Sequence, residues 1–486
     1  MFKKVFLIRA GSQSFASETL TPPVGLGYIA QILELNNISY DVLDMNFGYS
    51  YGFLKKRLEN YNPDLIGMGM GSALYDKNFR LISRIKRDFP KAKIVVGGWH
   101  ASVCKEKVLE ESAADFCIYG EAEHTIVSLC NNDDLMSIAG LIHRNNNNII
   151  SNDNRDCEKN LDVFPFPTYD KFEIEKYSNK REIGIITSRG CPYACTFCSA
   201  KIISGRKYRY RSAHNVIQEI DYWTKKKFKL IGILDDSFTS NKDRANQIFT
   251  ELENRLRCFD NEDLWSISFP NGVRADTLDD SMLKRMKRTG VKHLGIGVES
   301  ANNEILKKMK KSETIETIEK AIENAVSNDM KVTLFFLIGM PGETLIQLNN
   351  SINLALKYPV TNIYFNHPIP FPGTELYNYL TENNLLKIGH KKYLNSSKYY
   401  GNKPVFETHE MSFKERIKAE KLFKAARNEI HLRLFKQEIG SKSRLKKSLF
   451  FFYLFIGRYF INLRTAGNFI VRLKSLIGKS SNYSAR

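Results

Sequence analysis

Three of the chain's eight cysteines stand close together, at Cys191, Cys195 and Cys198. They form the spacing C-x3-C-x2-C directly after a short apolar run at residues 183–186. Three thiolates spaced in this way on one loop can bind three irons of a [4Fe-4S] cluster. The fourth iron then has no protein ligand and can bind a substrate directly. The pattern therefore predicts an iron–sulfur site that performs chemistry.

Zinc sites and disulfide bonds are two other common uses of clustered cysteines. A structural zinc site normally has four protein ligands, and no second C-x2-C or H-x3-H pair stands near this loop. A disulfide needs an oxidising compartment, whereas the sequence opens with Met-Phe-Lys-Lys and shows no secretory signal. We therefore favour the iron–sulfur interpretation and expect a cytoplasmic protein.

The cysteine loop resembles the cluster motif of the radical S-adenosylmethionine (radical SAM) enzymes, including the aromatic Phe197 before the last cysteine. The resemblance implies that Cys191, Cys195 and Cys198 hold a [4Fe-4S] cluster whose open iron binds S-adenosylmethionine. The reduced cluster would cleave the C5′–S bond, and the resulting 5′-deoxyadenosyl radical would abstract hydrogen from an unactivated carbon. A small-molecule substrate and an electron donor such as flavodoxin or ferredoxin are implied as partners.

Strand and helix patterns alternate over residues 182–380 and must position this loop. Six such units predict a partial (β/α)6 barrel of the TIM type, with functional groups at the carboxyl ends of its strands. The predicted strands are 183–187, 230–234, 266–269, 293–298, 331–338 and 362–367. Helices are predicted in the gaps, for example at 213–226, 279–289 and 314–328.

Polar and glycine motifs follow three of these predicted strands. Asp235 and Asp236 end the second strand, Glu299 ends the fourth, and Gly339 and Gly342 lie in the turn after the fifth. Aspartates after a strand also cap the helix that follows, so a capping role stays open for this pair. The radical SAM resemblance implies that the aspartates hold the methionine amino group and that Glu299 lies near the ribose and amino acid. The two glycines would border the adenine.

Residues 1–140 form a separate region in which strand and helix patterns also alternate. This alternation predicts a doubly wound, Rossmann-like parallel sheet, which binds ligands at the carboxyl ends of its strands. Residues 141–181 contain a hairpin tipped by asparagines and then a Phe-Pro-Phe-Pro segment. Because asparagine tolerates tight turns and proline forces an extended path, we interpret this segment as a linker.

Three motifs of the first region, at residues 21–28, 97–100 and 120–123, resemble those of the cobalamin-binding domain found in one radical SAM class. The third motif has Ala122 where that family usually has glycine. No D-x-H-x-x-G occurs, so the histidine that replaces the lower cobalt ligand in many cobalamin proteins is absent. His100 could ligate cobalt or make a local hydrogen bond. The resemblance implies cobalamin contacts from Pro22, Pro23, Gly25, Gly97, Gly98, His100, Gly120 and Glu121.

Residues 381–486 carry a weaker signal. A charged helix is predicted at 413–438, and no run of eighteen apolar residues occurs, so we expect no transmembrane helix. The formal net charge is +19, but ten basic and no acidic residues fall within 440–486. An aromatic run at 449–456 fits either a helix lying in a membrane interface or a terminal helix packed on the barrel. A nucleic-acid-binding arm would not need so apolar a run.

These features favour an enzyme that methylates an unactivated carbon of a natural-product or lipid-like substrate, with cobalamin as second cofactor. Cyclisation, ring contraction or oxidation assisted by cobalamin stays open as an alternative. An RNA methylthiotransferase would need a second cluster, for which Cys104, Cys117 and Cys130 are candidates, but we interpret these as buried thiols. A non-catalytic cluster-binding or nucleic-acid-binding module would not explain functional motifs at successive strand ends.

Overall fold

The computed structural model describes residues 1–11, 21–131, 134–146, 148–177, 182–256, 265–399 and 403–440 of the 486-residue chain. The chain divides into two compact units, Met1–Ala426 and Arg427–Arg486, and the first unit contains both predicted domains. The predicted basic tail and its aromatic run lie outside the described residues. Within the described part, no helix is long and apolar enough to cross a membrane.

The first domain is built around a seven-stranded sheet with the order β2-β1-β3-β4-β5-β6-β7. The parallel part confirms the predicted doubly wound sheet, because the chain runs outward from β1 toward both edges. It consists of β1 (Lys4–Arg9), β2 (Ser39–Asp44), β3 (Leu65–Gly69), β4 (Lys93–Gly97) and β5 (Phe116–Ile118).

The predicted asparagine-tipped hairpin forms the last two strands of this sheet, β6 (Leu141–Asn145) and β7 (Asn148–Ser151). Its turn contains Asn146 with a φ of 52°, a left-handed conformation that asparagine adopts more readily than most residues. β6 pairs antiparallel with β5. The hairpin therefore extends the sheet, a pairing that the sequence did not predict.

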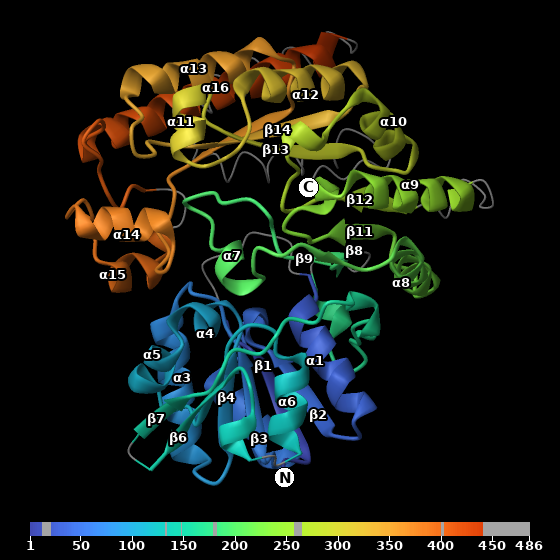
Figure 1. Cartoon of the computed structure of the whole chain (residues 1–486), viewed down its shortest axis with the longest axis vertical. Coiled ribbons are helices and arrows are strands. Elements are labelled where there is room, and N and C mark those ends of the chain that lie inside the picture. The colour runs from blue at the N-terminus through green and yellow to red at the C-terminus, as the bar shows by residue number, and fades with distance from the viewer. Residues whose placement is uncertain are drawn as a thin grey trace. The chain divides into compact units, whose positions relative to one another are not determined.

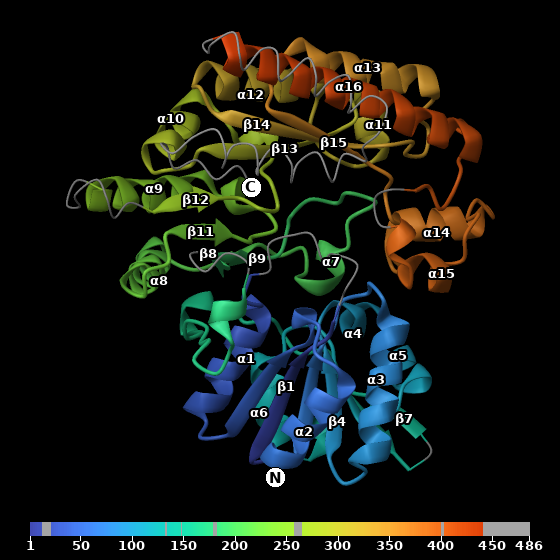
Figure 2. The ribbon, with the colours of Figure 1, turned by 180° about the vertical axis from the view of Figure 1, so that it is seen from behind.

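Helices cover both faces of the sheet (Figures 1 and 2). On one face, α1 (Val24–Leu35) contacts α6 (Glu123–Cys130). The other face carries α2 (Tyr51–Tyr61), α3 (Tyr75–Asp88) and α5 (Glu106–Glu111). There, Leu54, Ile82 and Leu109 from these three helices share a fully buried core with Phe6 and Ile8 of β1. Because both faces are covered, the parallel strands are apolar on both sides.

The second domain contains six parallel strands in two sheets. Parallel bridges from Ile267 to Val291 and from Val273 to Ile296 join the two sheets, so the strands follow one another in chain order. This arrangement confirms the predicted partial (β/α)6 barrel, and every predicted strand overlaps an observed one. The strands are β8 (Glu182–Ile185), β11 (Leu230–Ile233), β12 (Ser266–Ser268), β13 (His293–Glu299), β14 (Lys331–Leu337) and β15 (Asn362–Asn366).

Capping side chains start the helices that return between these strands. Ser212, Asp279 and Thr314 each accept a hydrogen bond from the backbone N–H three residues on. Thr344 forms a full capping box with Gln347. Figure 1 shows α12 and α13 on the outer side of β13 and β14. The capped helices are α8 (Ala213–Lys225), α10 (Asp280–Arg288), α12 (Ile315–Ser327) and α13 (Leu345–Lys357).

Two short helices after the barrel pack on the first domain. Leu376 and Leu380 of α14 (Glu375–Glu382) and Tyr393 of α15 (His390–Leu394) belong to the same buried core as Phe6. The predicted charged helix follows as α16 (Phe413–Gly440). The hydrophobic core of the first domain therefore continues into the chain that follows the last barrel strand.

Candidate active site

The three clustered cysteines lie on the loop after the short strand β9 (Ser188–Arg189). The backbone of this loop is held at Thr196, which donates to the Met309 carbonyl and accepts from the Leu376 N–H, each at 3.0 Å. Burial raises the pKa of each thiol. Because iron binds the thiolate, loading a cluster would release protons from this loop.

The donor set of this loop fits a [4Fe-4S] cluster. Cys191, Cys195 and Cys198 are half-buried and free of disulfide bonds. No three His, Cys, Asp or Glu side chains among the described residues surround one metal-ion position. A cluster does not need that arrangement, because each thiolate binds a different iron. Phe197, between the last two cysteines, packs against the buried core of the first domain.

Asp235 at the end of β11 holds the chain that leads into the cysteine loop. Its side chain is buried and accepts hydrogen bonds from the N–H and hydroxyl of Thr187 and from the hydroxyl of Ser188, at 2.5–2.6 Å. These contacts join the end of β11 to the segment after β8. Asp235 therefore positions the loop, and its contact with the methionine amino group stays a prediction.

Asp236 has different surroundings. It is half-buried, and burial raises the pKa of its carboxyl group, opposed by hydrogen bonds from Ser204 and the Gly190 backbone. Gly190 directly precedes Cys191, so Asp236 is the aspartate of the pair that lies beside the cluster loop. Neither aspartate supplies the cap of the next helix, because Asn241 accepts from the Arg244 N–H at 3.0 Å there.

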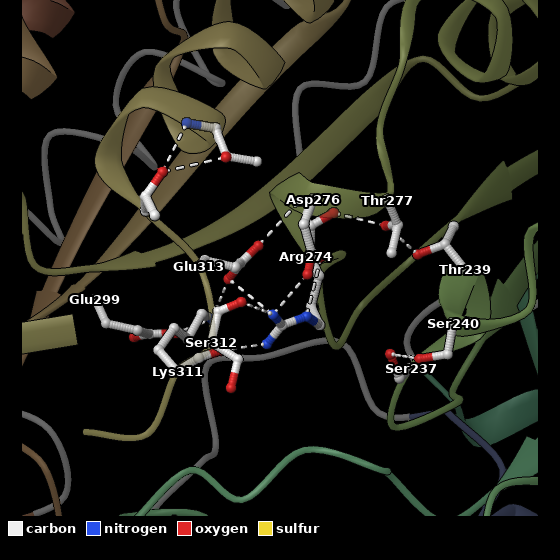
Figure 3. A network of polar contacts seen from close by, with 12 residues as sticks. Ser237, Thr239, Ser240, Arg274, Asp276, Thr277, Glu299, Lys311, Ser312 and Glu313 are labelled. Atoms are coloured by element: carbon white, nitrogen blue, oxygen red, sulfur yellow. Dashed lines mark hydrogen bonds and ion pairs between the residues drawn. The ribbon is translucent and has the colours of Figure 1, made fainter. Parts of the chain in front are cut away.

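A buried charge network lies at the ends of the third and fourth barrel strands (Figure 3). Lys311 contacts Glu299 at 3.1 Å and Glu313 at 3.4 Å. Arg274 contacts Asp276 at 2.8 Å and Glu313 at 3.6 Å. Glu313 is fully buried, so its charge depends on these two cations. Glu299, predicted as a cofactor contact, is thus paired with Lys311 as one carboxylate of a larger network.

The network reaches the cysteine loop through its two cations. The guanidinium of Arg274 lies 3.5 Å from the centre of the Tyr193 ring. Burial raises the pKa of Cys195, while Lys311 and Arg274 act in the opposite direction and favour its thiolate. Sequence reasoning missed both cations, because a basic residue in a loop between two elements has no distinctive spacing: Arg274 follows β12, and Lys311 lies between α11 (Asn303–Lys308) and α12.

Gly339 and Gly342 form the turn after β14, with φ values of 67° and 93°. A Cβ at Gly339 would lie 2.8 Å from Arg416 of α16, and one at Gly342 would lie 2.4 Å from Lys308. The positive φ values favour glycine at both positions, and the buried Arg416 adds a close contact at Gly339. The protein itself thus accounts for both glycines, and the adenine contact stays a prediction. Arg416 is fully buried and donates to the carbonyls of Ile338 and Gly339.

Glu343 lies in the same turn and is fully buried. Its carboxyl group accepts from the Gly339 N–H at 2.8 Å and from the Ser300 hydroxyl at 2.7 Å. Burial raises its pKa to about 7. The turn after the fifth strand is therefore tied through one carboxyl group to Ser300, the residue after Glu299.

The cobalamin-type motifs of the first domain lie at the carboxyl ends of its parallel strands. Gly25 and Gly120 have no atom within 4 Å of the point where a Cβ would stand. Gly98, with a φ of 96°, approaches the Met70 carbonyl so closely that a Cβ would lie 2.9 Å from it. This open, glycine-lined edge fits a large flat cofactor. Pro22 is buried, Pro23 caps α1, Gly97 ends β4, and Glu121 follows the end of β5.

His100 makes only local contacts among the described residues. Its ring is 3% exposed and stacks on Tyr75 at 4.3 Å, and its Nδ1 lies 3.3 Å from the Ser72 hydroxyl and 3.7 Å from Cys104 Sγ. Burial lowers its pKa to about 4. These contacts support the local hydrogen-bond interpretation over cobalt ligation.

The other candidate cysteines do not come together. Cys104 lies beside His100, after the carboxyl end of β4, whereas Cys130 ends α6 and its carbonyl accepts from the Phe2 N–H at 2.8 Å. Cys117 lies on β5, with its thiol directed at the Ala101 carbonyl. Burial raises the pKa of all three thiols. Cys117 and Cys130 fit the predicted role of buried thiols, Cys104 is half-buried, and the three do not form a second cluster site.

Each of the two domains matches a known protein family. Residues 185–355 match the radical SAM superfamily, and residues 15–130 match the B12 binding domain. The chain therefore belongs to the radical SAM enzymes that carry a cobalamin-binding domain ahead of the barrel. The [4Fe-4S] cluster, S-adenosylmethionine and cobalamin predicted from the sequence are thus the cofactors of this family.

Several relatives are methyltransferases by name. The chain is 29% identical over 381 residues to an uncharacterized methyltransferase of Pyrococcus horikoshii, covering 76% of this chain and 80% of the relative. It is 26% identical over 444 residues to the cytidylyl-2-hydroxyethylphosphonate methyltransferase of Streptomyces wedmorensis, covering 77% and 81%. It is also 25% identical over 377 residues to the anaerobic magnesium-protoporphyrin IX monomethyl ester cyclase of Rubrivivax gelatinosus, covering 74% and 66%.

Solved structures share the fold. The radical S-adenosylmethionine methyltransferase TsrM of Kitasatospora setae, with cobalamin and a [4Fe-4S] cluster bound, superimposes with a TM-score of 0.67 at 18% identity. The match covers 79% of this chain and 78% of TsrM. The cobalamin-dependent radical enzyme OxsB gives a TM-score of 0.66 at 20% identity, over 87% of this chain and 61% of OxsB.

Proposed function

We propose that this protein is a cobalamin-dependent radical SAM methyltransferase that methylates an unactivated carbon of a small molecule. The observation that carries the proposal is the contact between the two cofactor domains. Glu121, at the end of β5 in the cobalamin-type edge, is ion-paired with Arg189 at 3.2 Å, and Arg189 lies two residues before Cys191. The edge that fits cobalamin and the loop that fits the cluster thus lie next to each other, as methyl transfer between the two sites requires.

When loaded, these cofactors supply reductive cleavage of S-adenosylmethionine to a carbon radical and a methyl group carried on cobalt. The residues of the chain hold and orient them. Cys191, Cys195 and Cys198 would bind the cluster, and the carboxylate of Asp236 lies beside that loop. Lys311 and Arg274 place positive charge close to Cys195, which favours its ligating thiolate form.

The substrate class follows from the substrates that the relatives' names give. The named relatives act on a cytidylyl phosphonate and on a porphyrin ester, so the fold serves chemically unrelated small molecules. We infer a small-molecule substrate and electrons from a flavodoxin or ferredoxin. A lipophilic substrate and a peripheral membrane contact depend on the tail beyond residue 440, which lies outside the described residues.

Cyclisation without methyl transfer is the second candidate, because one relative is a cyclase by name. The fate of the methyl group separates the two functions. Anaerobically reconstituted enzyme, with cobalamin and a chemical reductant, would be incubated with S-adenosylmethionine carrying a CD3 group and a metabolite extract of the source organism. Mass spectrometry would follow 5′-deoxyadenosine and every extract component that gains the CD3 label.

A methyltransferase transfers the CD3 label to an extract component while 5′-deoxyadenosine forms. The variant Cys191→Ala/Cys195→Ala/Cys198→Ala is the control and should form neither product, although it still binds cobalamin. Formation of 5′-deoxyadenosine with a new, unlabelled product would instead support the cyclase or oxidase hypothesis and contradict the methyltransferase proposal.

A further inference from the structure

Arg189 is the last residue of β9 and joins the cysteine loop to the first domain. One of its terminal nitrogens lies 3.2 Å from Glu121, and the other lies 2.5 Å from Glu123. Both carboxylates come from the third motif of the cobalamin-type edge. The planar guanidinium also lies over the rings of Tyr28 and Phe164, at 5.4 and 4.8 Å. Arg189 thus contacts the first motif, the third motif and the linker together.

Arg209 makes a second contact with the same motif. It lies opposite Arg189 in the two-stranded ribbon formed by β9 and β10 (Arg209–Tyr210). Its guanidinium donates two hydrogen bonds to the two oxygens of Glu121, at 2.7 and 3.1 Å. It also donates to the carbonyls of Glu158 at 2.8 Å and Ser204 at 3.3 Å. We call Arg189, Arg209, Glu121 and Glu123 the arginine–glutamate cluster.

The arginine–glutamate cluster is buried. The side chains of Arg189 and Arg209 are 12% and 3% exposed, and those of Glu121 and Glu123 are 15% and 8% exposed. Burial opposes the charge on Glu121, but the two arginines outweigh it and keep the pKa of this carboxyl group lowered. Because buried charges are stable only when paired, losing one partner would leave the others uncompensated and shift the ribbon.

Such a shift would be passed on to the first cluster ligand. Gly190, between Arg189 and Cys191, has a φ of 88°, and a Cβ there would lie 2.4 Å from the Lys207 carbonyl. The Cys191 N–H donates to the Gly205 carbonyl at 3.2 Å. The chain between the arginine and the cysteine is therefore closely packed against its surroundings, with little freedom to absorb a displacement.

We propose that Arg189 is a positioning residue that, through Glu121, couples cobalamin binding in the first domain to retention of the iron–sulfur cluster in the second. Cobalamin bound at the glycine-lined edge would order the turn that carries Glu121, and Glu121 would hold Arg189 and hence Cys191. A coupling of this kind is reciprocal, so the cluster would also strengthen cobalamin binding. The proposal rests on the two cofactors of the family and not on the reaction proposed above.

The test measures iron release from anaerobically reconstituted full-length protein to an excess of ferrozine, with and without hydroxocobalamin. No substrate is present, so the result is independent of the reaction. Coupling between sites typically changes affinities by roughly fivefold or more. We therefore expect cobalamin to slow iron release from the wild-type protein by about fivefold or more. An unchanged rate would overturn the proposal without any variant.

Two substitutions assign the coupling to the arginine–glutamate cluster. Arg189→Lys keeps the charge but cannot reach both carboxylates with a planar fork, and Arg209→Lys keeps the charge but loses the two-pronged hydrogen bond to Glu121. Both should still bind cobalamin, but cobalamin should then slow iron release by less than about twofold. Glu219→Gln is the control, because Glu219 pairs with Arg211 in a still more deeply buried site within the second domain. In this control, cobalamin should slow iron release by the same factor as in the wild type. The same factor in the two test variants would refute the role of Arg189.

Discussion

The carboxyl group of Asp235 accepts from the Thr187 N–H at 2.6 Å and from the Thr187 hydroxyl at 2.5 Å. The N–H donates to Oδ1 and the hydroxyl donates to Oδ2, so both carboxyl oxygens accept a hydrogen bond from Thr187. Thr187 starts the segment that enters the cysteine loop. The pair therefore fixes where the chain leaves the first barrel strand.

Replacing Asp235 by asparagine should lower the thermal unfolding midpoint and the iron content after reconstitution. The amide has only one acceptor, so at least one buried donor loses its partner, a loss of roughly 1–3 kcal/mol. Asp243→Asn is the control, because Asp243 is exposed in the first turn of α9 (Lys242–Leu256) and should leave the midpoint nearly unchanged. Equal midpoints for the wild type and the Asp235 variant would show that these hydrogen bonds do not hold the segment.

A second prediction concerns the glycine before the first cysteine. Gly190→Ala should reduce cluster iron and stability strongly, because its Cβ would lie 2.4 Å from the Lys207 carbonyl. Gly205→Ala is the control: it has a similar φ of 75° but nothing within 4 Å of its Cβ. It should cost only the backbone strain of about 1–2 kcal/mol. Iron assays and melting curves compare the two variants. Similar losses of iron and stability in both would mean that backbone strain, and not the close contact with Lys207, causes the effect of Gly190→Ala.

His100 provides a third prediction. His100→Gln should retain cobalamin at about one per chain, because the imidazole contacts Tyr75, Ser72 and Cys104. Electron paramagnetic resonance of the reduced cobalt should show no splitting from a protein nitrogen in either protein. Loss of such a splitting on substitution would identify His100 as a cobalt ligand and correct the local interpretation.

The architecture was largely predictable because its signals are local. Buried parallel strands read as apolar runs, and motifs after strands appear at the carboxyl edge that the topology dictates. Contacts between distant segments were not predictable. β6 pairs with β5, and Glu121 pairs with Arg189. No periodic pattern in the sequence indicates which distant residues pair in this way.

Contacts between distant segments also decide the roles of several site residues, so the sequence did not predict those roles. Resemblance marked Gly339 as a cofactor neighbour, but the close contact that requires glycine there comes from Arg416, on a helix far along the chain. Asp235 and Asp236 looked equivalent in sequence, yet hydrogen bonds to Thr187 and Ser188 give Asp235 a structural role. Only the cysteine spacing carried its chemistry within a single local motif.

Glu343 makes stability depend on pH in an unusual direction. Its folded-state pKa of about 7 lies above the ordinary value of 4.5, because the carboxyl group is fully buried. A raised carboxyl pKa means that the folded state favours the neutral form. The corresponding stabilisation is complete below about pH 4.5 and is lost as the pH rises through about 7, by at most roughly 3 kcal/mol.

The wild-type protein should therefore lose stability between pH 5.5 and pH 8 from this group. Glu343→Gln stays neutral, so its thermal midpoint should fall less over that interval, whereas Glu304→Gln, at an exposed carboxyl group of α11 (Asn303–Lys308), should follow the wild-type profile. Parallel profiles for the wild type and the Glu343 variant would show that Glu343 does not titrate in this range.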